Sequence, residues 1–241
     1  KKMILVGVNP PNQIEQRWLN DLAMDDSVVV FTETTSNLHH KDFFASIDKM
    51  IAPLTDEEFK QLQPDILITF GGLIISKKVK AFLRQYQPKQ HWHIDENKAN
   101  NTFFCLEKHI EVHPNIFFTD FLPKITHFVK SDYKTYWESI KQMRNKKHDE
   151  FTKDAVFSDF KVFDTLLKSL PNDSILQVGN SSAVRYVQLF DVNPSVEVFC
   201  NRGTSGIDGS TSTAVGASWV YGSPTLLVTG DLSFFYDSNA L

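Results

Sequence analysis

Three glycine-rich polar segments follow apolar, strand-like runs in the last third of the chain. The segments span 179–182, 201–209 and 230–233, and seven of the ten glycines lie from Gly179 onward. Small residues expose backbone N–H groups, and the helix that starts after such a segment attracts anions. If the three segments share one sheet edge, their natural ligand is a phosphate or a diphosphate. Ordinary turns between strands and helices use the same residue types, so one such segment alone would carry little weight.

Charged residues near these segments sharpen the prediction. After Lys168 the chain has only two cationic residues, Arg185 and Arg202, and both lie in or beside the glycine-rich segments. Arginine suits bidentate recognition of carboxylates and phosphates. Asp231 directly follows the apolar run and Gly230. It could cap the next helix, or it could hold Mg²⁺ beside a diphosphate, and the local sequence leaves both roles open.

The elements that must position these residues alternate between strand and helix. Apolar runs at 3–8, 28–31, 66–70, 92–94 and 110–112 predict strands in the first part, and runs at 175–178, 196–200 and 225–229 predict strands in the second. This alternation predicts an α/β protein with two doubly wound, mostly parallel sheets that carry helices on both faces. We expect one domain over 1–130, a polar linker helix over 131–150 that ends in a charged run, and a second domain over 151–241.

The composition excludes several classes of protein. With 41% hydrophobic and 22% charged residues among 241, and a net charge of −4, the chain is globular in type and lacks the basic surface typical of general nucleic-acid binding. No apolar run approaches the ~20 residues that span a bilayer. The two cysteines, Cys105 and Cys200, suit packed thiols in a reducing cytoplasm. Walker A, G-x-S-x-G and H-E-x-x-H motifs are absent from the sequence.

The same segments carry a family resemblance. Asn-Arg-Gly-Thr-Ser-Gly-Ile-Asp-Gly at 201–209 and Gly-Asp-Leu-Ser at 230–233 resemble thiamine-diphosphate-dependent enzymes, and Gly-Asn-Ser-Ser-Ala-Val-Arg at 179–185 fits the same group. Leu232 stands where most of that superfamily has a second glycine. With this leucine the chain resembles one branch of the superfamily, the synthases of 2-succinyl-5-enolpyruvyl-6-hydroxy-3-cyclohexene-1-carboxylate (SEPHCHC) in menaquinone biosynthesis. The strong resemblance covers about the last quarter of the chain.

The resemblance implies an activity. Such enzymes have three α/β domains, so residues 1–130 would be the central domain and 151–241 the first part of the diphosphate-binding domain. Thiamine diphosphate and Mg²⁺ (or Mn²⁺) would be the cofactors, and the reaction would decarboxylate 2-oxoglutarate and add the succinyl-level carbanion to isochorismate. The intact protein would be a homodimer or homotetramer in the cytoplasm, with no nucleic acid and no integral membrane segment. We expect the chain to be part of a longer protein and to be inactive by itself.

The resemblance also implies roles for single residues. Asp231 would bind the metal, while Arg185, Arg202 and Ile207 would be catalytic. Substrate would meet Lys77, Ser181, Arg185 and Arg202, although Lys77 could equally be an exposed lysine at a helix start. The cofactor would meet a larger set along the three segments: Asn180, Ser181, Gly203, Ser205, Ile207, Gly230, Asp231, Leu232 and Ser233.

Three alternatives stay open. One is another thiamine-diphosphate decarboxylase or an acetolactate-synthase-like enzyme. Another is a non-catalytic module that binds a diphosphate and regulates a partner. The third is a sugar or amino-acid sensor with its ligand between two α/β lobes and no need for a metal.

Overall fold

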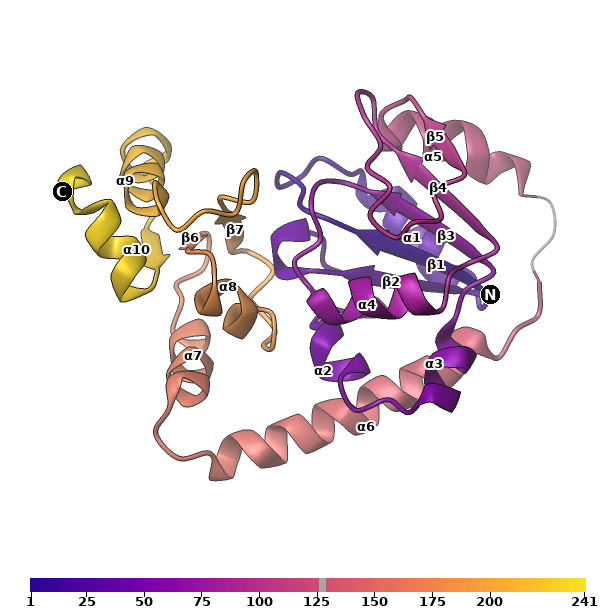
Figure 1. Cartoon of the computed structure of the whole chain (residues 1–241), viewed down its shortest axis with the longest axis horizontal. Helices are drawn as coiled ribbons and strands as arrows, with labels where there is room; N and C mark the ends of the chain where they lie inside the picture. Colours follow the sequence, from indigo (N-terminus) through magenta and orange to yellow (C-terminus); the bar gives the residue numbers. More distant parts are fainter. Residues whose placement is uncertain (126–128) are drawn as a thin grey trace. The chain divides into compact units, whose positions relative to one another are not determined.

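The structure is a computed structural model that describes residues 1–125 and 129–241. It consists of two compact units, Lys1–Asp149 and Glu150–Leu241. Each unit has a sheet whose strands are all parallel, with helices packed around it, so the predicted α/β class with two parallel sheets is confirmed (Figure 1).

The first unit is built on a five-stranded sheet. Its strands lie in the order β2-β1-β3-β4-β5, and every neighbouring pair is parallel. Their bounds are β1 Lys2–Val6, β2 Val28–Thr32, β3 Ile66–Phe70, β4 Gln90–Ile94 and β5 Lys108–Ile110. All five residues of β2 are buried, and so are the last four of β1 and of β3. Such continuous burial is typical of central parallel strands that are covered on both faces.

Alternating residues of β1 belong to two separate cores. Met3 and Leu5 pack with the helices of one face, whereas Ile4 and Val6 pack with those of the other. The first face is covered by α2 (Ile47–Ile51), α3 (Asp56–Leu62), α4 (Lys77–Gln85) and the start of α6 (Tyr133–Asp154). The second face is covered by α1 (Gln16–Met24) and α5 (Pro114–Phe121), and short 3₁₀ turns follow β2 and α5 at Thr34–Ser36 and Leu122–Lys124. Figure 1 shows the two helical layers on opposite sides of the sheet.

Two loops at the carboxyl edge of this sheet meet backbone to backbone. A Cβ atom on Gly7, after β1, would lie 1.9 Å from the carbonyl oxygen of Gly72, after β3. The Gly72 N–H donates to the carbonyl of Val8 at 2.7 Å, and the Asn37 amide donates to the carbonyl of Asn9 at 2.9 Å. Only glycine fits at residue 7, because any side chain would separate the loops.

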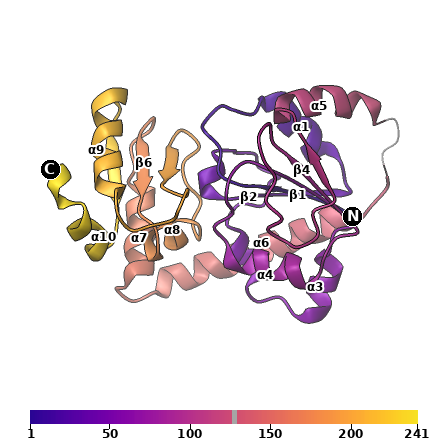
Figure 2. The ribbon, with the colours of Figure 1, turned by 45° about the horizontal axis from the view of Figure 1, so that its top comes forward.

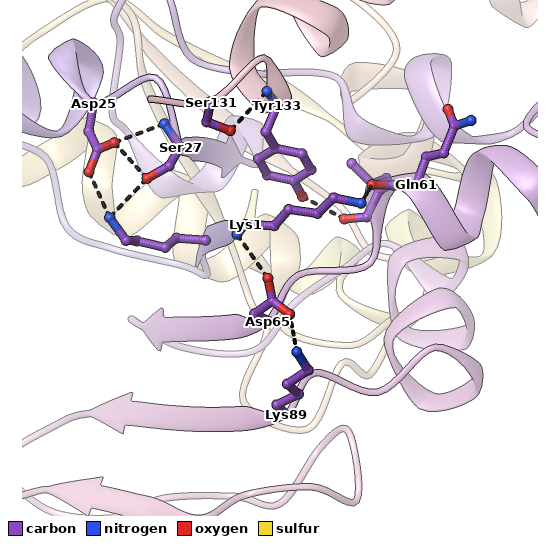
Figure 3. Close-up of polar contacts among 10 residues, drawn as sticks. Lys1, Asp25, Ser27, Gln61, Asp65, Lys89, Ser131 and Tyr133 are labelled. Carbon is purple, nitrogen blue, oxygen red and sulfur yellow. Dashed lines mark hydrogen bonds and ion pairs between the residues drawn. The ribbon is translucent and has the colours of Figure 1, made fainter. Parts of the chain in front are cut away.

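The amino edge of the sheet is held by ion pairs (Figure 3). Asp25 accepts from the Ser27 N–H at 2.8 Å and from the Lys2 ammonium at 2.9 Å. Lys89 donates to Asp65 at 2.8 Å. The Tyr133 hydroxyl, at the start of α6, donates to the carbonyl of Leu62 at 2.5 Å. These contacts hold the start of α6 and the residues at or just before the starts of β1 to β4 at the same edge of the sheet.

Two elements differ from their predicted bounds. The strand predicted at 110–112 is β5, two residues earlier, because His113 caps α5 and Pro114 begins it. The helix predicted over 131–150 extends beyond the charged run to Asp154. No Gly or Pro interrupts that run, and its opposite charges stand three or four residues apart, a spacing that supports a helix.

The second unit has a three-stranded parallel sheet in the order β7-β6-β8. Its strands are β6 (Ile175–Val178), β7 (Glu197–Cys200) and β8 (Thr225–Val228). Its helices are α7 (Asp159–Lys168), α8 (Ser182–Val187), α9 (Ser210–Tyr221) and α10 (Asp231–Tyr236), and a 3₁₀ turn follows at Ser238–Ala240. The strand β6 is buried throughout, whereas every residue of β8 is half-buried. Over residues 1–125 and 129–241, no helix is long and apolar enough to cross a membrane.

Candidate functional site

The carboxyl ends of β6, β7 and β8 stand level. Val178 is in register with Cys200 on one side and with Val228 on the other. The three glycine-rich segments therefore leave the sheet at one edge, as the sequence predicts. The helices that follow begin at Ser182, Ser210 and Asp231, and α9 and α10 lie side by side (Figure 2).

Gly179 lets the ends of β6 and β8 approach closely. Its N–H donates to the carbonyl of Val228 at 2.7 Å. A Cβ on Gly179 would lie 2.6 Å from the Thr229 hydroxyl oxygen and 3.1 Å from the Thr229 Cα. A methyl group at residue 179 would therefore require the Thr229 side chain to move and its backbone to shift slightly.

Asn180 connects two of the three segments. Its side chain is buried, and its amide nitrogen donates to the carbonyl of Asn201 at 2.7 Å and to that of Gly206 at 2.6 Å. Its amide oxygen accepts from Arg202 Nη1 at 2.7 Å. Both amide hydrogens and the oxygen are thus used within the protein. The structure therefore places Asn180 as the residue that orders the loop around Arg202.

Ser181 has a strained backbone. Its φ is +71° and its ψ is −122°, at the turn between β6 and α8. L-residues rarely adopt this conformation, and it costs of order 1–3 kcal/mol. Ser181 is exposed just before α8, and Arg185 is exposed on α8 itself.

The second and third segments are joined at Ile207 and Ser233. Ser233 is buried, and its hydroxyl donates to the carbonyl of Ile207. Ile207 itself is half-buried. Ser205, in the same loop, has a φ of +60°, and around Gly203 and Gly230 an added Cβ would meet nothing within 4 Å. The backbone is thus open at these two glycines, while the hydroxyl of Ser233 holds the loops together.

Asp231 is the first residue of α10, and its carboxylate is exposed. Gly230 occupies the N-cap position, and the Asp231 carboxylate accepts from the Leu232 N–H at 2.8 Å within the first turn of α10. Leu232 is also exposed, at 61%. In the part of the chain that is described, no three His, Cys, Asp or Glu side chains gather as metal ligands. One carboxylate suits Mg²⁺, which usually takes few protein ligands and completes its shell with waters and phosphate oxygens.

Several buried polar atoms at this edge have no partner within residues 1–125 and 129–241. They are Arg202 Nε and the hydroxyl oxygens of Thr229, Ser210 and Thr211. An unpaired buried donor costs roughly 1–3 kcal/mol, so a guanidinium N–H in this state is suited to an incoming anion. Together with the open backbone at Gly203 and Gly230, this donor set fits a ligand that carries phosphate or carboxylate groups.

Two residues near this edge have structural roles. That of Asp237 was not predicted from the sequence, whereas Cys200 was expected to be a packed thiol. Asp237 is buried and accepts from the Ser212 hydroxyl at 2.5 Å and from the Ser212 N–H at 2.7 Å; these hydrogen bonds lower its pKa. Asp237, the residue that follows α10, therefore caps the first turn of α9. Burial raises the pKa of the Cys200 thiol to about 11, which suits the packed thiol expected there.

Lys77 belongs to the first unit. It is the first residue of α4 and is exposed at the carboxyl edge of the five-stranded sheet. The buried N-cap Ser76 precedes it, and the Ser76 hydroxyl accepts from the Val79 N–H at 3.0 Å.

The whole chain aligns with known proteins. It is 56% identical over 241 residues to the SEPHCHC synthase of Flavobacterium psychrophilum, 54% identical over 242 residues to that of Flavobacterium johnsoniae, and 53% identical over 246 residues to that of Christiangramia forsetii. The resemblance to SEPHCHC synthases is confirmed.

The match covers the chain completely but its relatives only in part. The alignments include 100% of this chain, and they span 44%, 44% and 42% of these three SEPHCHC synthases. No protein-family model matches the chain. The similarity to SEPHCHC synthases includes both units, whereas the residues that suggested it from sequence lie mainly in the second.

Proposed function

We propose that this chain forms part of a SEPHCHC synthase that uses thiamine diphosphate and Mg²⁺ to decarboxylate 2-oxoglutarate and join the product to isochorismate. The observation that carries the proposal is the identity of more than half of the residues to three such synthases over the full chain. Two features of the structure support the proposal: the three segments leave one edge of the sheet, and Arg202 Nε has no partner among the described residues.

The cofactor would be held at the carboxyl edge of the three-stranded sheet. Thiamine diphosphate, when bound, supplies the electron sink that decarboxylation of a 2-oxo acid requires. Phosphate oxygens would approach the backbone at Gly203 and Gly230, where an added Cβ would meet nothing within 4 Å, and the exposed carboxylate of Asp231 would hold Mg²⁺. Ile207 would provide apolar support, with its carbonyl fixed by Ser233.

The arginines would recognise the substrates, which are both polyanions. Arg202 is anchored at one nitrogen by Asn180, and its Nε remains for a carboxylate. Arg185 on α8 and Ser181 just before it are both exposed. A carboxylate between these groups would be oriented by charged hydrogen bonds, which are about twice as strong as neutral ones.

The experiment is a turnover assay with the intact protein. Thiamine diphosphate, Mg²⁺, 2-oxoglutarate and isochorismate are supplied, and isochorismate consumption is followed while each component is omitted in turn. We expect consumption only when all four are present. CO₂ release from 2-oxoglutarate without isochorismate loss would reject the acceptor, and the absence of both would reject the reaction. The 241-residue chain alone is expected to be inactive, so turnover by it would contradict the proposed need for residues outside it.

A further inference from the structure

Two histidines of β4, His91 and His93, lie on one face of the five-stranded sheet. Residues two apart in a strand share a face, and Thr69 of the neighbouring strand β3 is the register partner of His93. His91 and Thr69 are buried, and His93 is half-buried. Polar groups in such a place find their hydrogen-bond partners within the protein. The hydrogens of these three side chains therefore have few possible arrangements.

The Thr69 hydroxyl lies between the two imidazoles. Its oxygen is 2.9 Å from His91 Nε2 and 2.8 Å from His93 Nδ1. The carbonyl oxygen of Trp92 is farther away, at 3.5 Å. A hydroxyl has one hydrogen to donate and two lone pairs that accept. It therefore donates to one imidazole only, and the other imidazole must donate to it, so the tautomer of each ring is tied to that of the other.

The second nitrogen of His91 decides between the two arrangements. His91 Nδ1 is buried and has no partner within residues 1–125 and 129–241. An unpaired N–H in a protein interior is rarer than an unpaired acceptor. Neutral His91 therefore carries its hydrogen on Nε2 and donates to Thr69. Thr69 in turn donates to His93 Nδ1, and neutral His93 carries its hydrogen on Nε2.

Protonation of His93 reverses this arrangement. A charged imidazole carries a hydrogen on both nitrogens, so His93 Nδ1–H donates to Thr69. The Thr69 hydrogen then turns to His91 Nε2, because the alternative acceptor is at the limit of hydrogen-bond distance. Neutral His91 must then carry its hydrogen on Nδ1, where it has no partner in the described part of the chain. The net change is the uptake of one proton from water.

We propose that Thr69, His91 and His93 form a pH-sensitive device, in which charging His93 changes the tautomer of His91 and leaves an unpaired N–H in the core. The device lies within the first unit and does not depend on the proposed function. Phe103 packs against His91 with ring centroids 5.5 Å apart, and the Glu107 N–H donates to the His91 carbonyl at 3.0 Å. Acid therefore loosens the segment between β4 and β5, which rests on His91.

The groups around the two rings determine which ring takes up a proton first. Burial, together with the neighbouring His93, lowers the pKa of His91 to about 4. Burial also lowers the pKa of His93, whereas Asp95, directly after β4, raises it and His109 on β5 lowers it. As the pH falls, His93 is therefore charged while His91 is still neutral.

Other titratable groups on this face are engaged elsewhere. Glu111 Oε1 lies 3.6 Å from His109 Nδ1. Arg84 and Lys80 of α4, the helix that covers this face, each donate to a backbone carbonyl. Burial raises the pKa of the Cys105 thiol, so it stays protonated. These groups leave the Thr69 hydroxyl as the link between the two rings.

The test follows the histidine tautomers of the intact protein. The protein is labelled with ¹⁵N histidine and measured by solid-state NMR at about pH 7.5 and about pH 5, on either side of the ordinary histidine pKa. Charged imidazoles and the two neutral tautomers give different nitrogen shifts, and loss of signals in His91→Gln and His93→Gln assigns them. We expect His93 to become charged at the lower pH, while His91 stays neutral and moves its hydrogen from Nε2 to Nδ1.

Substitutions separate the device from ordinary titration. Thr69→Val keeps the shape but removes the hydroxyl, so His91 should keep one tautomer at both pH values, whereas Thr69→Ser should restore the change. Thr32→Val is the matched control, because Thr32 is buried at the carboxyl end of β2, and it should behave as the parent. If Thr69→Val fails to fold, His93→Gln gives the same test, since His91 should then keep one tautomer.

Hydrogen exchange at the Glu107 N–H measures the effect on the fold. After correction for the intrinsic pH dependence of exchange, we expect its protection to fall by between about fivefold and 150-fold at the lower pH, and by much less in His93→Gln. Any of five results would overturn the proposal: an uncharged His93 at about pH 5, an unchanged tautomer of His91 in the parent, a change that persists in Thr69→Val or His93→Gln, its loss in Thr32→Val, or unchanged protection at Glu107.

Discussion

Arg202 and Asn180 form a hydrogen-bonded pair at the carboxyl end of the three-stranded sheet. Arg202 Nη1 donates to the Asn180 amide oxygen at 2.7 Å, while the Asn180 nitrogen holds the backbone of Asn201 and Gly206. The guanidinium is thus oriented from one side, and its buried Nε is left without a partner among the residues described. An arginine held in this way is prepared to accept an anion without first choosing a rotamer.

Substitution of either residue should weaken substrate binding. We expect Arg202→Ala to raise the KM for a substrate by the equivalent of about 1.5–3 kcal/mol, because a charged hydrogen bond is lost, while cofactor affinity is spared. Arg202→Lys should restore little, since lysine cannot reproduce the planar fork. Steady-state kinetics at saturating cofactor measure this effect. An unchanged KM in both variants would show that Arg202 does not bind substrate.

Asn180→Ala should affect stability as well as kinetics. It leaves two carbonyls and one guanidinium nitrogen without their partner, at a cost of roughly 1–3 kcal/mol for each buried group that stays unsatisfied. We expect a lower denaturation midpoint together with a higher KM. Asn180→Asp keeps the acceptor for Arg202 and should retain more of the substrate affinity than Asn180→Ala. Equal KM values in the two variants would show that the bond to Arg202 does not matter for binding.

Asp231→Asn should impair metal-dependent cofactor binding. The substitution replaces a charged oxygen ligand by a neutral one at a position exposed to the site. We expect thiamine diphosphate to bind at least about tenfold more weakly in the presence of Mg²⁺, equivalent to about 1.4 kcal/mol. Calorimetric titration of the intact protein measures this change. Asp191→Asn is the control, because Asp191 is an exposed carboxylate in the loop after α8. Equal affinities in Asp231→Asn and its parent would exclude Asp231 as a ligand.

Ser181 provides a test of backbone strain. Ser181→Ala removes the hydroxyl and keeps the φ of +71°, whereas Ser181→Gly removes the hydroxyl and tolerates that φ. The glycine variant should therefore be more stable than the alanine variant by about 1 kcal/mol, after the greater entropy of unfolded glycine is included. Both should raise the KM for substrate to a similar degree. If the alanine variant proved equally stable, the turn would not be strained in solution.

Glu33 should make stability depend on pH. Burial raises the pKa of Glu33 to about 7 from its ordinary value of 4.5, against the N–H groups of Ile75 and Ser76, which lower it; the charge of Asp48 raises it and that of Lys80 lowers it. Between these two pKa values the folded state keeps a proton that the unfolded state has lost. The resulting stabilisation is fully present below pH 4.5 and is lost as the pH rises through 7.

Comparison with Glu33→Gln isolates this effect. The free energy of unfolding of the parent should fall by about 3 kcal/mol relative to that of the variant between pH 4.5 and 7. Tryptophan fluorescence during chemical denaturation is a suitable probe, because Trp18 and Trp137 are buried in the first unit, whereas Trp219 of the second is 90% exposed. Parallel pH profiles would mean that Glu33 has the same pKa in the folded and unfolded states.

Much of the fold and of the site could be predicted from local sequence. Apolar runs that end in glycine-rich segments predicted the parallel sheets and the shared edge, because strand pattern and turn chemistry are local properties. The positions of the backbone openings at Gly203 and Gly230 follow the same logic. The proposed contacts of these residues with cofactor and substrate stay predictions.

Other features depend on partners distant in sequence and could not be predicted in this way. The cofactor contact expected of Asn180 stays a prediction, whereas its hydrogen bonds to a loop more than twenty residues later could not be predicted. Glu33 gives no signal as a residue type, because a glutamate after an apolar run usually lies in solvent. Its burial depends on the arrival of α4, 42 residues later in sequence. The local pattern at Asp231 suits a cap as well as a ligand; its carboxylate accepts from the Leu232 N–H in the first turn of α10, and its binding of a metal stays a prediction.

The close contact of Gly7 with Gly72 has a consequence for the entropy of the loop that leads to α4. This loop is held at its beginning by that contact and at its end by Glu33. Its conformational entropy is therefore lost when the protein folds. A bulkier residue at position 7 would separate the two loops and return part of this freedom to the folded state, at residues far along the chain from the one that was changed.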